Sequence, residues 1–529
     1  MSVASTDSGS PQPPGASTRA QQRTARWWMR LLVAAPVLLL AGFAVVGTAL
    51  PAVRVRELSI LDEAAHIDSV FKVPSVDRSG EKFLPQTLGE VSCRGGIAQW
   101  PDWQPPPCGV PQGVPPADYR IGSGGYDTAD IHPPVYYFAT AALAAVGLWF
   151  VDADAVTLMR LTGSLYLAVG ICLTWLLARR LGANRWAAFG TAGLLVTAPN
   201  VLYMSSIVNV DASVIMASAG FGLVVLTVWR RGSAWWALPL LAVGLMLVKM
   251  TNLGALIATA LFLIITAVTA PIRGSARPLA AGAGNGPRDP LDGSASARRA
   301  ADEAPPAAAP AAADAEAGTA GEPAPPGRSA AVARWRRHLG RWVAANGPGT
   351  VRAVGLSTLM ALGAVVVTLG WLGIQNLRAL VPADELWFTQ QFKVDRLLVG
   401  NIGDSLLSFW EPHGLWAPWM SDRPYLGAVL LMITAAVPLG LMVASWFRRR
   451  EVYPIQLAAL ITMAIAAPVY VAMNYVVNGI YFNPDFRYGL SVLPFFAAAV
   501  AAGVQTRVAG AVISGLAVVG MVTTLVSLI

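Results

Sequence analysis

The chain has 529 residues, of which 55% are hydrophobic and 13% are charged, and its mean hydropathy is +0.53. This composition excludes an ordinary soluble domain. The formal net charge of +8 does not indicate nucleic-acid binding, because the arginines gather in short loops between apolar segments, where the positive-inside rule accounts for them. We therefore predict a multi-pass membrane protein without a nucleic-acid partner.

The N-terminal part of the chain is predicted to form a tail, a first span and a large loop. Residues 1–30, rich in Ser, Pro, Gln and Arg, are predicted to be a disordered cytoplasmic tail. The apolar run over residues 31–50 is long enough to cross the bilayer, and it places residues 51–157 outside the cytoplasm. Within that loop, Pro133–Val151 is predicted to be a juxtamembrane helix, because a span there would move the arginine-rich turn at residues 179–185 outside.

The rest of the chain supplies ten more predicted spans, for about eleven in total. Residues 271–350, rich in Ala and Pro, cannot bury enough apolar area to fold and are predicted to be a disordered cytoplasmic linker between the membrane core (31–270) and the C-terminal helices (351–529). An external loop is expected at residues 376–424. The later spans are expected at Leu158–Ala178, Trp186–Ser206, Ala212–Trp229, a pair within 234–270, Val351–Ile374, Tyr425–Phe447, Ile455–Asn474 and a final pair broken at 505–507. The predicted fold class is an all-α polytopic transmembrane bundle.

The first candidate site is the segment Leu61-Asp62-Glu63-Ala64-Ala65-His66, just beyond the first span. Two adjacent carboxylates and a histidine one helical turn later can meet at the membrane surface. A sugar transfer needs one carboxylate to take the proton of an acceptor hydroxyl and a second polar group to orient the first. Asp62 and Glu63 are therefore candidate catalytic residues and His66 a candidate substrate-binding residue. The alternative is a solvated acid pair or a helix N-cap.

A second motif places Asp130 and His132 immediately before two consecutive prolines. The prolines fix the start of the juxtamembrane helix and direct the preceding polar residues to one side. Asp130 and His132 are therefore candidate substrate-binding residues in the same pocket as Asp62. For Tyr136 and Tyr137, which follow the prolines, an interfacial aromatic belt is the preferred interpretation.

Three cations lie near predicted external helix ends: Arg160, Lys249 and Arg487. Such residues are expensive near lipid. Facing the interior of the bundle, they could bind the phosphate of a lipid donor and stabilise the charge that develops as it leaves. The alternative is snorkelling to lipid headgroups, which suits Arg160 best.

Two of the three cysteines, Cys93 and Cys108, flank a Trp/Pro-rich stretch of the large loop. Because that side of the membrane is oxidising, a disulfide between them is plausible. Cys172, in an apolar helix, is interpreted as a small core residue.

No metal or cofactor is assigned. The chain has no Walker A, HExxH or Gly-rich nucleotide motif, which argues against a nucleotide-sugar donor or a zinc protease. Asp62, Glu63, Asp127 and Asp130 could together ligate a divalent cation, but nothing in their spacing demands one.

These motifs, in this order, resemble the protein O-mannosyltransferase and aminoarabinose-transferase group of the GT-C glycosyltransferases. The pair Asp62-Glu63 followed by His66 is similar to the Asp-Glu…His motif of that group's first external loop, with one extra residue before the histidine. The stretch from Asp130 to the two prolines is similar to its second loop motif. The resemblance covers residues 30–270 well and the remainder loosely.

The resemblance implies a polyprenyl-phosphate sugar donor, Asp62 as the base, and Arg160, Lys249 or Arg487 on the donor phosphate. It also implies inversion at the anomeric carbon. The predicted function is transfer of a sugar, mannose or a pentose, to an extracytoplasmic hydroxyl of a protein, glycan or lipid at the plasma membrane. Alternatives from other classes are a lipid or solute transporter or flippase, and a membrane scaffold whose loop binds a partner.

Overall fold

The protein is built from helices throughout the part of the chain that the structure describes. The computed structural model describes residues 16–96, 108, 127–269, 328–382, 384–397, 399–405, 423–446, 452–482, 484 and 486–529. Within these ranges it contains no strand, only an isolated backbone bridge between Lys393 and Ile480. The predicted all-α fold class is confirmed.

The helices fall into two groups along the chain. Those before residue 270 are α1 (Ala16–Arg54), α2 (Glu63–Phe71), α3 (Pro85–Cys93), η1 (Ala129–Ile131), α4 (Val135–Gly147), α5 (Ala155–Arg180), α6 (Arg185–Val196), α7 (Pro199–Ser206), η2 (Val210–Ser213), α8 (Val214–Arg231), α9 (Ala237–Val248), η3 (Met250–Asn252) and α10 (Leu253–Thr269). Those after residue 327 are α11 (Arg328–Arg378), α12 (Trp387–Phe392), α13 (Val399–Asp404), α15 (Pro424–Leu431), η8 (Met432–Ala436), α16 (Val437–Trp446), α17 (Tyr453–Asn478), η9 (Phe486–Gly489), α18 (Leu493–Gly503) and α19 (Arg507–Leu528).

Among the described residues, eight helical segments are long and apolar enough to cross a membrane. A ninth crossing results if α6 and α7, which are bent by 61° at their junction, count as one span. The protein is therefore a multi-pass membrane protein, but the predicted number of eleven spans is not reached. The difference lies in α9 and α18, which have 12 and 11 residues. At 1.5 Å per residue they rise only about 18 and 16 Å, against a hydrocarbon core of about 30 Å.

A polar break in the chain lies at one end of each short helix. Helix α9 ends because Lys249 adopts extended backbone (φ −162°, ψ 134°) before the turn η3. Helix α18 starts only after the 3-10 turn η9, which contains Arg487 and Tyr488. The backbone at the first break is stabilised locally, since the side-chain Nδ2 atom of Asn252 donates to the carbonyl of Leu245 at 2.9 Å. Each of the two short helices is therefore interrupted at a cation.

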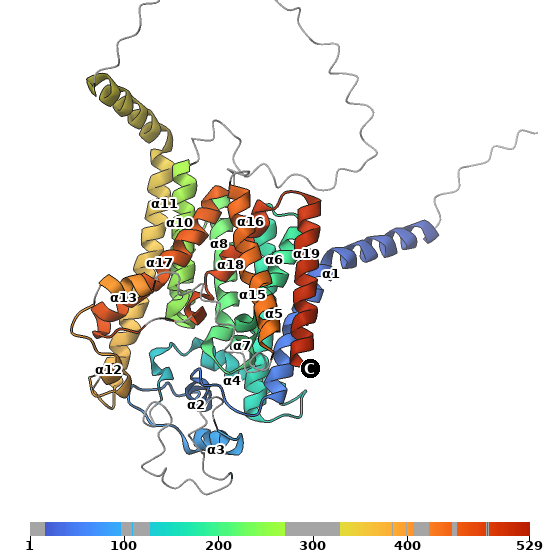
Figure 1. Cartoon of the computed structure of the whole chain (residues 1–529), viewed down its shortest axis with the longest axis vertical. Helices are drawn as coiled ribbons and strands as arrows, with labels where there is room; N and C mark the ends of the chain where they lie inside the picture. Colours follow the sequence, from blue (N-terminus) through green and yellow to red (C-terminus); the bar gives the residue numbers. More distant parts are fainter. Residues whose placement is uncertain are drawn as a thin grey trace, which may run out of the picture.

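The bundle has two chemically different ends. Helices α5 and α8 finish with Arg179–Arg180 and Arg230–Arg231, and α19 begins with Arg507. These termini lie at the end of the bundle opposite α2, α3 and α4 (Figure 1). We call the first the basic end and the second the site end. Arginines at successive helix termini are the pattern that the positive-inside rule predicts for a cytoplasmic face.

The loop between α1 and α5 covers the site end, and the second group of helices holds it in place. The Arg378 guanidinium at the end of α11 donates to the carbonyl of Val76 at 2.8 Å, and the Leu380 amide donates to the carbonyl of Ser79 at 2.8 Å. Trp371, also on α11, donates to the carbonyl of Ile131 at 3.1 Å. Segments more than 230 residues apart in sequence therefore meet there.

Helix α4 agrees with the juxtamembrane helix predicted at residues 133–151. Its 13 residues are apolar but too few to cross a bilayer. The residues that follow it are strongly exposed, above all Trp149 at 82% and Phe150 at 80%. An exposed apolar segment beside a membrane-spanning helix is suited to the lipid interface.

Parts of the two segments predicted to be disordered are helical in the structure. Helix α1 begins at Ala16 and α11 at Arg328. Residues 16–30 of the predicted tail and residues 328–350 of the predicted linker are therefore helical. Residues 1–15 and 270–327 lie outside the described part of the chain.

Glycines allow the helices of the core to approach closely. Gly163 on α5 faces the carbonyl group of Ser205 on α7, and Gly190 on α6 faces the backbone of Ile513 and Ser514 on α19. Small residues at helix crossings are the usual way to gain van der Waals packing between helices in a membrane. The positions of α5 and α7 in turn fix the segment between α7 and η2, which contacts the site.

We expect Gly163→Ala to destabilise the bundle by about 1–3 kcal/mol, because the added methyl group would overlap the Ser205 carbonyl and push α5 from α7. The measurement is the midpoint of thermal unfolding in detergent. Gly42→Ala on α1 is the matched control, since its added methyl would meet no atom within 4 Å. Equal midpoints for the two variants would contradict this account.

Candidate functional site

Asp62 occupies an unusual backbone position at the start of α2. Its φ of 59° and ψ of 17° lie in the left-handed region, which few non-glycine residues adopt. The side chain forms no helix-capping hydrogen bond and is 49% exposed. Its Oδ2 atom pairs with Nη1 of Arg487 at 3.1 Å. The predicted base is thus accessible, and the partner that holds it comes from the far end of the sequence.

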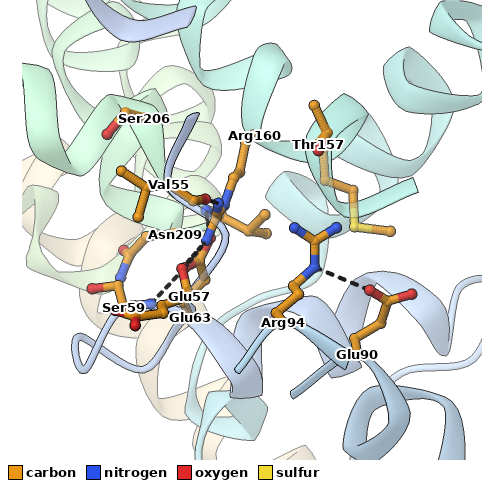
Figure 2. Close-up of polar contacts among 12 residues, drawn as sticks. Val55, Glu57, Ser59, Glu63, Glu90, Arg94, Thr157, Arg160, Ser206 and Asn209 are labelled. Carbon is orange, nitrogen blue, oxygen red and sulfur yellow. Dashed lines mark hydrogen bonds and ion pairs between the residues drawn. The ribbon is translucent and has the colours of Figure 1, made fainter. Parts of the chain in front are cut away.

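Glu63, the second predicted catalytic carboxylate, is completely buried and fully engaged. Arg160 on α5 donates to Oε1 from Nε at 2.7 Å and to Oε2 from Nη2 at 2.8 Å (Figure 2). The backbone amides of Ser59 and Val208 add hydrogen bonds at 2.7 and 3.0 Å. A carboxylate that accepts four hydrogen bonds in a dry site is poorly placed to take a proton from substrate. The structure therefore argues against a direct catalytic role for Glu63 and for a positioning role.

The same ion pair argues against the predicted role of Arg160 on a donor phosphate. Its side chain is 1% exposed, and besides Glu63 it donates to the carbonyls of Val55 and Glu57. These acceptors account for most of the donors of a guanidinium. Arg160 instead attaches the end of α1 and the start of α2 to α5.

Lys249 and Arg487 lie on one aromatic ring. The Lys249 Nζ atom is 5.3 Å from the centroid of the Tyr488 ring, and Cζ of Arg487 is also 5.3 Å from it. Lys249 is buried and forms an ion pair with Asp211 at 2.5 Å. The structure thus brings together two of the three predicted cations, each beside a carboxylate.

Asn209 connects this group to the Asp62 segment. Its Oδ1 atom accepts a hydrogen bond from the amide of Asp211 at 2.9 Å, so it caps η2. Its Nδ2 atom donates to the carbonyl of Leu61 at 2.9 Å. Asn209 therefore contacts both Asp211, the ion-pair partner of Lys249, and Leu61, the residue before Asp62.

His66 and His132 also belong to this group. His66 is one turn after Asp62 on α2, and its ring stacks on that of His132 with centroids 5.5 Å apart. Burial lowers the pKa of His66 to about 3; the charge of Asp62 opposes this shift, and Lys249 and Arg487 add smaller contributions in the same direction as burial. Burial and the same two cations also lower the pKa of His132. Both rings are therefore neutral at physiological pH.

The tyrosines after the two prolines are part of the core, and the prediction of an interfacial belt is wrong. Tyr136 and Tyr137 are 2% and 4% exposed. The Tyr137 hydroxyl lies 2.9 Å from Nδ1 of His66. The sequence did contain a signal for this contact. Tyr137 lies on the helix that begins after the two prolines, close behind His132.

A second polar cluster surrounds Lys72 and does not join the Asp62 group. The Lys72 ammonium lies 2.6 Å from Asp68, 2.8 Å from Asp77 and 3.2 Å from Asp127. The carboxylates of Asp68 and Asp127 also accept backbone amides, from Leu84 and Ala129. Burial, with the neighbouring carboxylates, raises the pKa of Asp127. The acidic side chains and the lysine together hold the loop in one conformation.

These same three aspartates are the described residues whose oxygens lie close enough together to hold a metal ion. The Lys72 ammonium supplies positive charge at that position. The four carboxylates considered from the sequence do not assemble, because Asp62 pairs with Arg487, Glu63 with Arg160 and Asp127 with Lys72. Asp130 is buried near Asp77 rather than beside Asp62.

Cys93 and Cys108 form a disulfide in the structure, with Cα atoms 4.4 Å apart. Cys93 ends α3, and the next residue, Arg94, pairs with Glu90 at 3.0 Å and also with Asp154 at the start of α5. The covalent bond and the ion pairs therefore attach the outer part of the loop to the bundle.

Comparison with known proteins gives one family match. Residues 131–282 match the model of a family described as dolichyl-phosphate-mannose-protein mannosyltransferase. The matched region contains His132, Tyr137 and Lys249 and leaves out Asp62 and Arg487. The match indicates a membrane glycosyltransferase and supports membership of the GT-C superfamily. No curated protein and no solved structure matches the chain significantly.

We expect Glu63→Gln to destabilise the protein by about 3–5 kcal/mol, because it leaves the buried Arg160 without a countercharge. Glu90→Gln is the control, since its pair with Arg94 is partly exposed (Figure 2), and it should cost at most about 1 kcal/mol. Thermal unfolding in detergent measures both. A Glu63→Gln variant as stable as Glu90→Gln would overturn the role assigned to the buried pair.

Asp130 makes a prediction about pH. Burial raises its pKa from 3.8 to about 6, so the folded state holds a proton that the unfolded state releases between these values. Stability from this group is therefore lost as pH rises toward 6. Asp130→Asn should be more stable than the unmodified protein at pH 8, by up to ~3 kcal/mol, and the difference should vanish near pH 4. The measurement is the midpoint of thermal unfolding in detergent at the two pH values. A difference independent of pH would contradict the assignment.

Proposed function

We propose that this protein transfers a sugar from a polyprenyl-phosphate donor to an acceptor hydroxyl on the extracytoplasmic side of the plasma membrane. The observation that carries the proposal is the accessible carboxylate of Asp62 beside Arg487, with Lys249 on the same Tyr488 ring. A base beside two cations is what displacement of a phosphate by a hydroxyl requires. The family match supports the lipid-linked donor.

In the proposed reaction, Asp62 takes the proton of the acceptor hydroxyl as its oxygen attacks the anomeric carbon. The bond from that carbon to the phosphate oxygen breaks, and the polyprenyl phosphate leaves with the electron pair. Lys249 and Arg487 bind the phosphate and stabilise its charge. Attack opposite to the leaving phosphate inverts the configuration at the anomeric carbon. Glu63 holds Asp62 in place through Arg160 and has no part in the proton transfer.

The orientation in the membrane follows from the charge of the two ends. The basic end carries the arginines at the ends of α5 and α8 and the start of α19, so we place it in the cytoplasm. The site end then faces outward, where lipid-linked sugars rather than nucleotide sugars are the available donors. A disulfide between Cys93 and Cys108 is compatible with that compartment.

We infer mannose as the first sugar to test and a pentose as the second. The description of the matched family names mannose, and it speaks for a transferase rather than the transporter or flippase considered from the sequence. The acceptor belongs to the class of hydroxyls on proteins, glycans or lipids outside the cytoplasm.

Asp62→Asn should lower turnover by about 10²–10⁴-fold, the contribution of a general base, with donor binding retained. The measurement is consumption of polyprenyl-phosphate mannose, or of the corresponding pentose donor, by purified protein. Asp152→Asn, exposed in the loop after α4, is the matched control and should keep full activity. Unchanged turnover by the Asp62 variant would remove the base, and no consumption of either donor by the unmodified protein would reject the proposed function.

A further inference from the structure

The hydrogen bond between Tyr137 and His66 has a chemical consequence for the site. The Tyr137 Oη atom on α4 lies 2.9 Å from Nδ1 of His66 on α2, and both side chains are almost completely buried. A neutral imidazole carries one N–H, on either Nδ1 or Nε2. Because the ring is neutral, its partner at Nδ1 decides which nitrogen carries that hydrogen.

The direction of this bond follows from the two other neighbours of the Tyr137 hydroxyl, the Ser69 side chain and the carbonyl of Ala129. Tyr137 could instead donate to the carbonyl of Ala129, but that oxygen is 3.5 Å away and already accepts the amide of His132 at 2.9 Å. Hydroxyl hydrogen bonds are normally 2.5–3.0 Å long, so the contact at 3.5 Å is weak. Burial raises the pKa of Tyr137, whereas the hydrogen bond from Ser69 lowers it, as expected when the serine hydroxyl donates to the phenolic oxygen. The hydroxyl hydrogen of Tyr137 is then left for Nδ1 of His66, and the imidazole hydrogen resides on Nε2.

We propose that Tyr137 is a positioning residue that holds His66 in the Nε2–H tautomer, so that the ring offers a neutral hydrogen-bond donor to an anionic oxygen of the substrate. This inference rests on the proposed function. Nδ1 faces α4, so Nε2 lies on the opposite edge of the ring. The charged groups that act on the imidazole are Asp62, Lys249 and Arg487, the groups assigned to the reaction. Stacking on His132 fixes the plane of the ring.

The tautomer matters because Nε2 accepts a hydrogen bond in one form and donates one in the other. A ring with hydrogen on Nδ1 would present a lone pair at Nε2 and would repel a phosphate oxygen. A ring with hydrogen on Nε2 can donate to that oxygen without adding a charge that Lys249 and Arg487 would disfavour. When Tyr137 donates to Nδ1, the Nε2–H group of His66 becomes a third hydrogen-bond donor to the phosphate, beside Lys249 and Arg487.

The tautomer can be measured by NMR, since the chain has four histidines and their resonances can be told apart. The histidines are His66, His132, His338 and His413. Protein labelled with ¹⁵N-histidine, in detergent at pH 7, should show His66 with an unprotonated Nδ1 and a protonated Nε2. The His66→Gln variant identifies its resonances. In Tyr137→Phe the fixed tautomer should give way to a mixture, whereas Tyr136→Phe, the same change one residue earlier, should leave the spectrum unaltered. Hydrogen on Nδ1 in the unmodified protein, or an unchanged tautomer in Tyr137→Phe, overturns the proposal.

Turnover provides the second readout. Tyr137→Phe should lower kcat/KM by roughly ten- to a hundredfold, the effect of one hydrogen bond to a charged group. Glutamine at position 66 places its amide N–H near the position of Nε2 and needs no tyrosine to orient a tautomer. Tyr137→Phe should therefore add no further loss in the His66→Gln background, and a full additional loss would mean that Tyr137 acts only by packing. If the unmodified protein consumes neither donor, the proposed function fails while the NMR result still decides the tautomer.

Discussion

The buried ion pair between Glu63 and Arg160 is the interaction on which the rest of the site depends. It joins the first residues after α1 to α5, and the amides of Ser59 and Val208 complete the shell around the carboxylate. Burying two charges is costly, and the cost is offset only when the geometry is good and the remaining polar atoms are satisfied. Both conditions hold here, and the pair therefore defines one position for the start of α2. Asp62, the residue before Glu63, is held next to that position.

The residues of the candidate site come from the chain before and after residues 270–327. Asp62, His66 and Lys249 precede it, whereas Arg487 and Tyr488 come from the turn before α18. Contacts from α11 to the loop, through Trp371 and Arg378, bring the second group of helices against the first. Neither group of helices contains the candidate site alone, so the site depends on the packing of the two groups against each other.

The sequence was sufficient to predict the helical membrane fold and to indicate several residues that lie together at the candidate site. The spacing of Asp62 and His66, the two prolines after His132 and the cations at breaks between apolar segments are all local signals, and these groups do meet in the structure. The roles of Glu63 and Arg160 could not be predicted, because their pairing joins residues 97 positions apart. The burial of Tyr136 and Tyr137 depends likewise on packing against α2 and α5, which an aromatic pattern near an interface does not reveal. The separation of Asp130 from Asp62 has the same cause, since only the folded loop places it near Asp77.

The shortness of α9 and α18 determines how deep the two cations lie. Measured from the basic end, each helix rises little more than half the thickness of the hydrocarbon core before Lys249 or the turn with Arg487 is reached. Under the orientation and function proposed above, the positive charges are recessed below the outer membrane surface rather than displayed on it. A lipid phosphate could approach them while its isoprenoid tail stays among the acyl chains, so no part of the tail would have to be extracted into water. A water-soluble acceptor, in contrast, would have to enter as far as Asp62. The loop between α1 and α5 would then determine which acceptors reach the site.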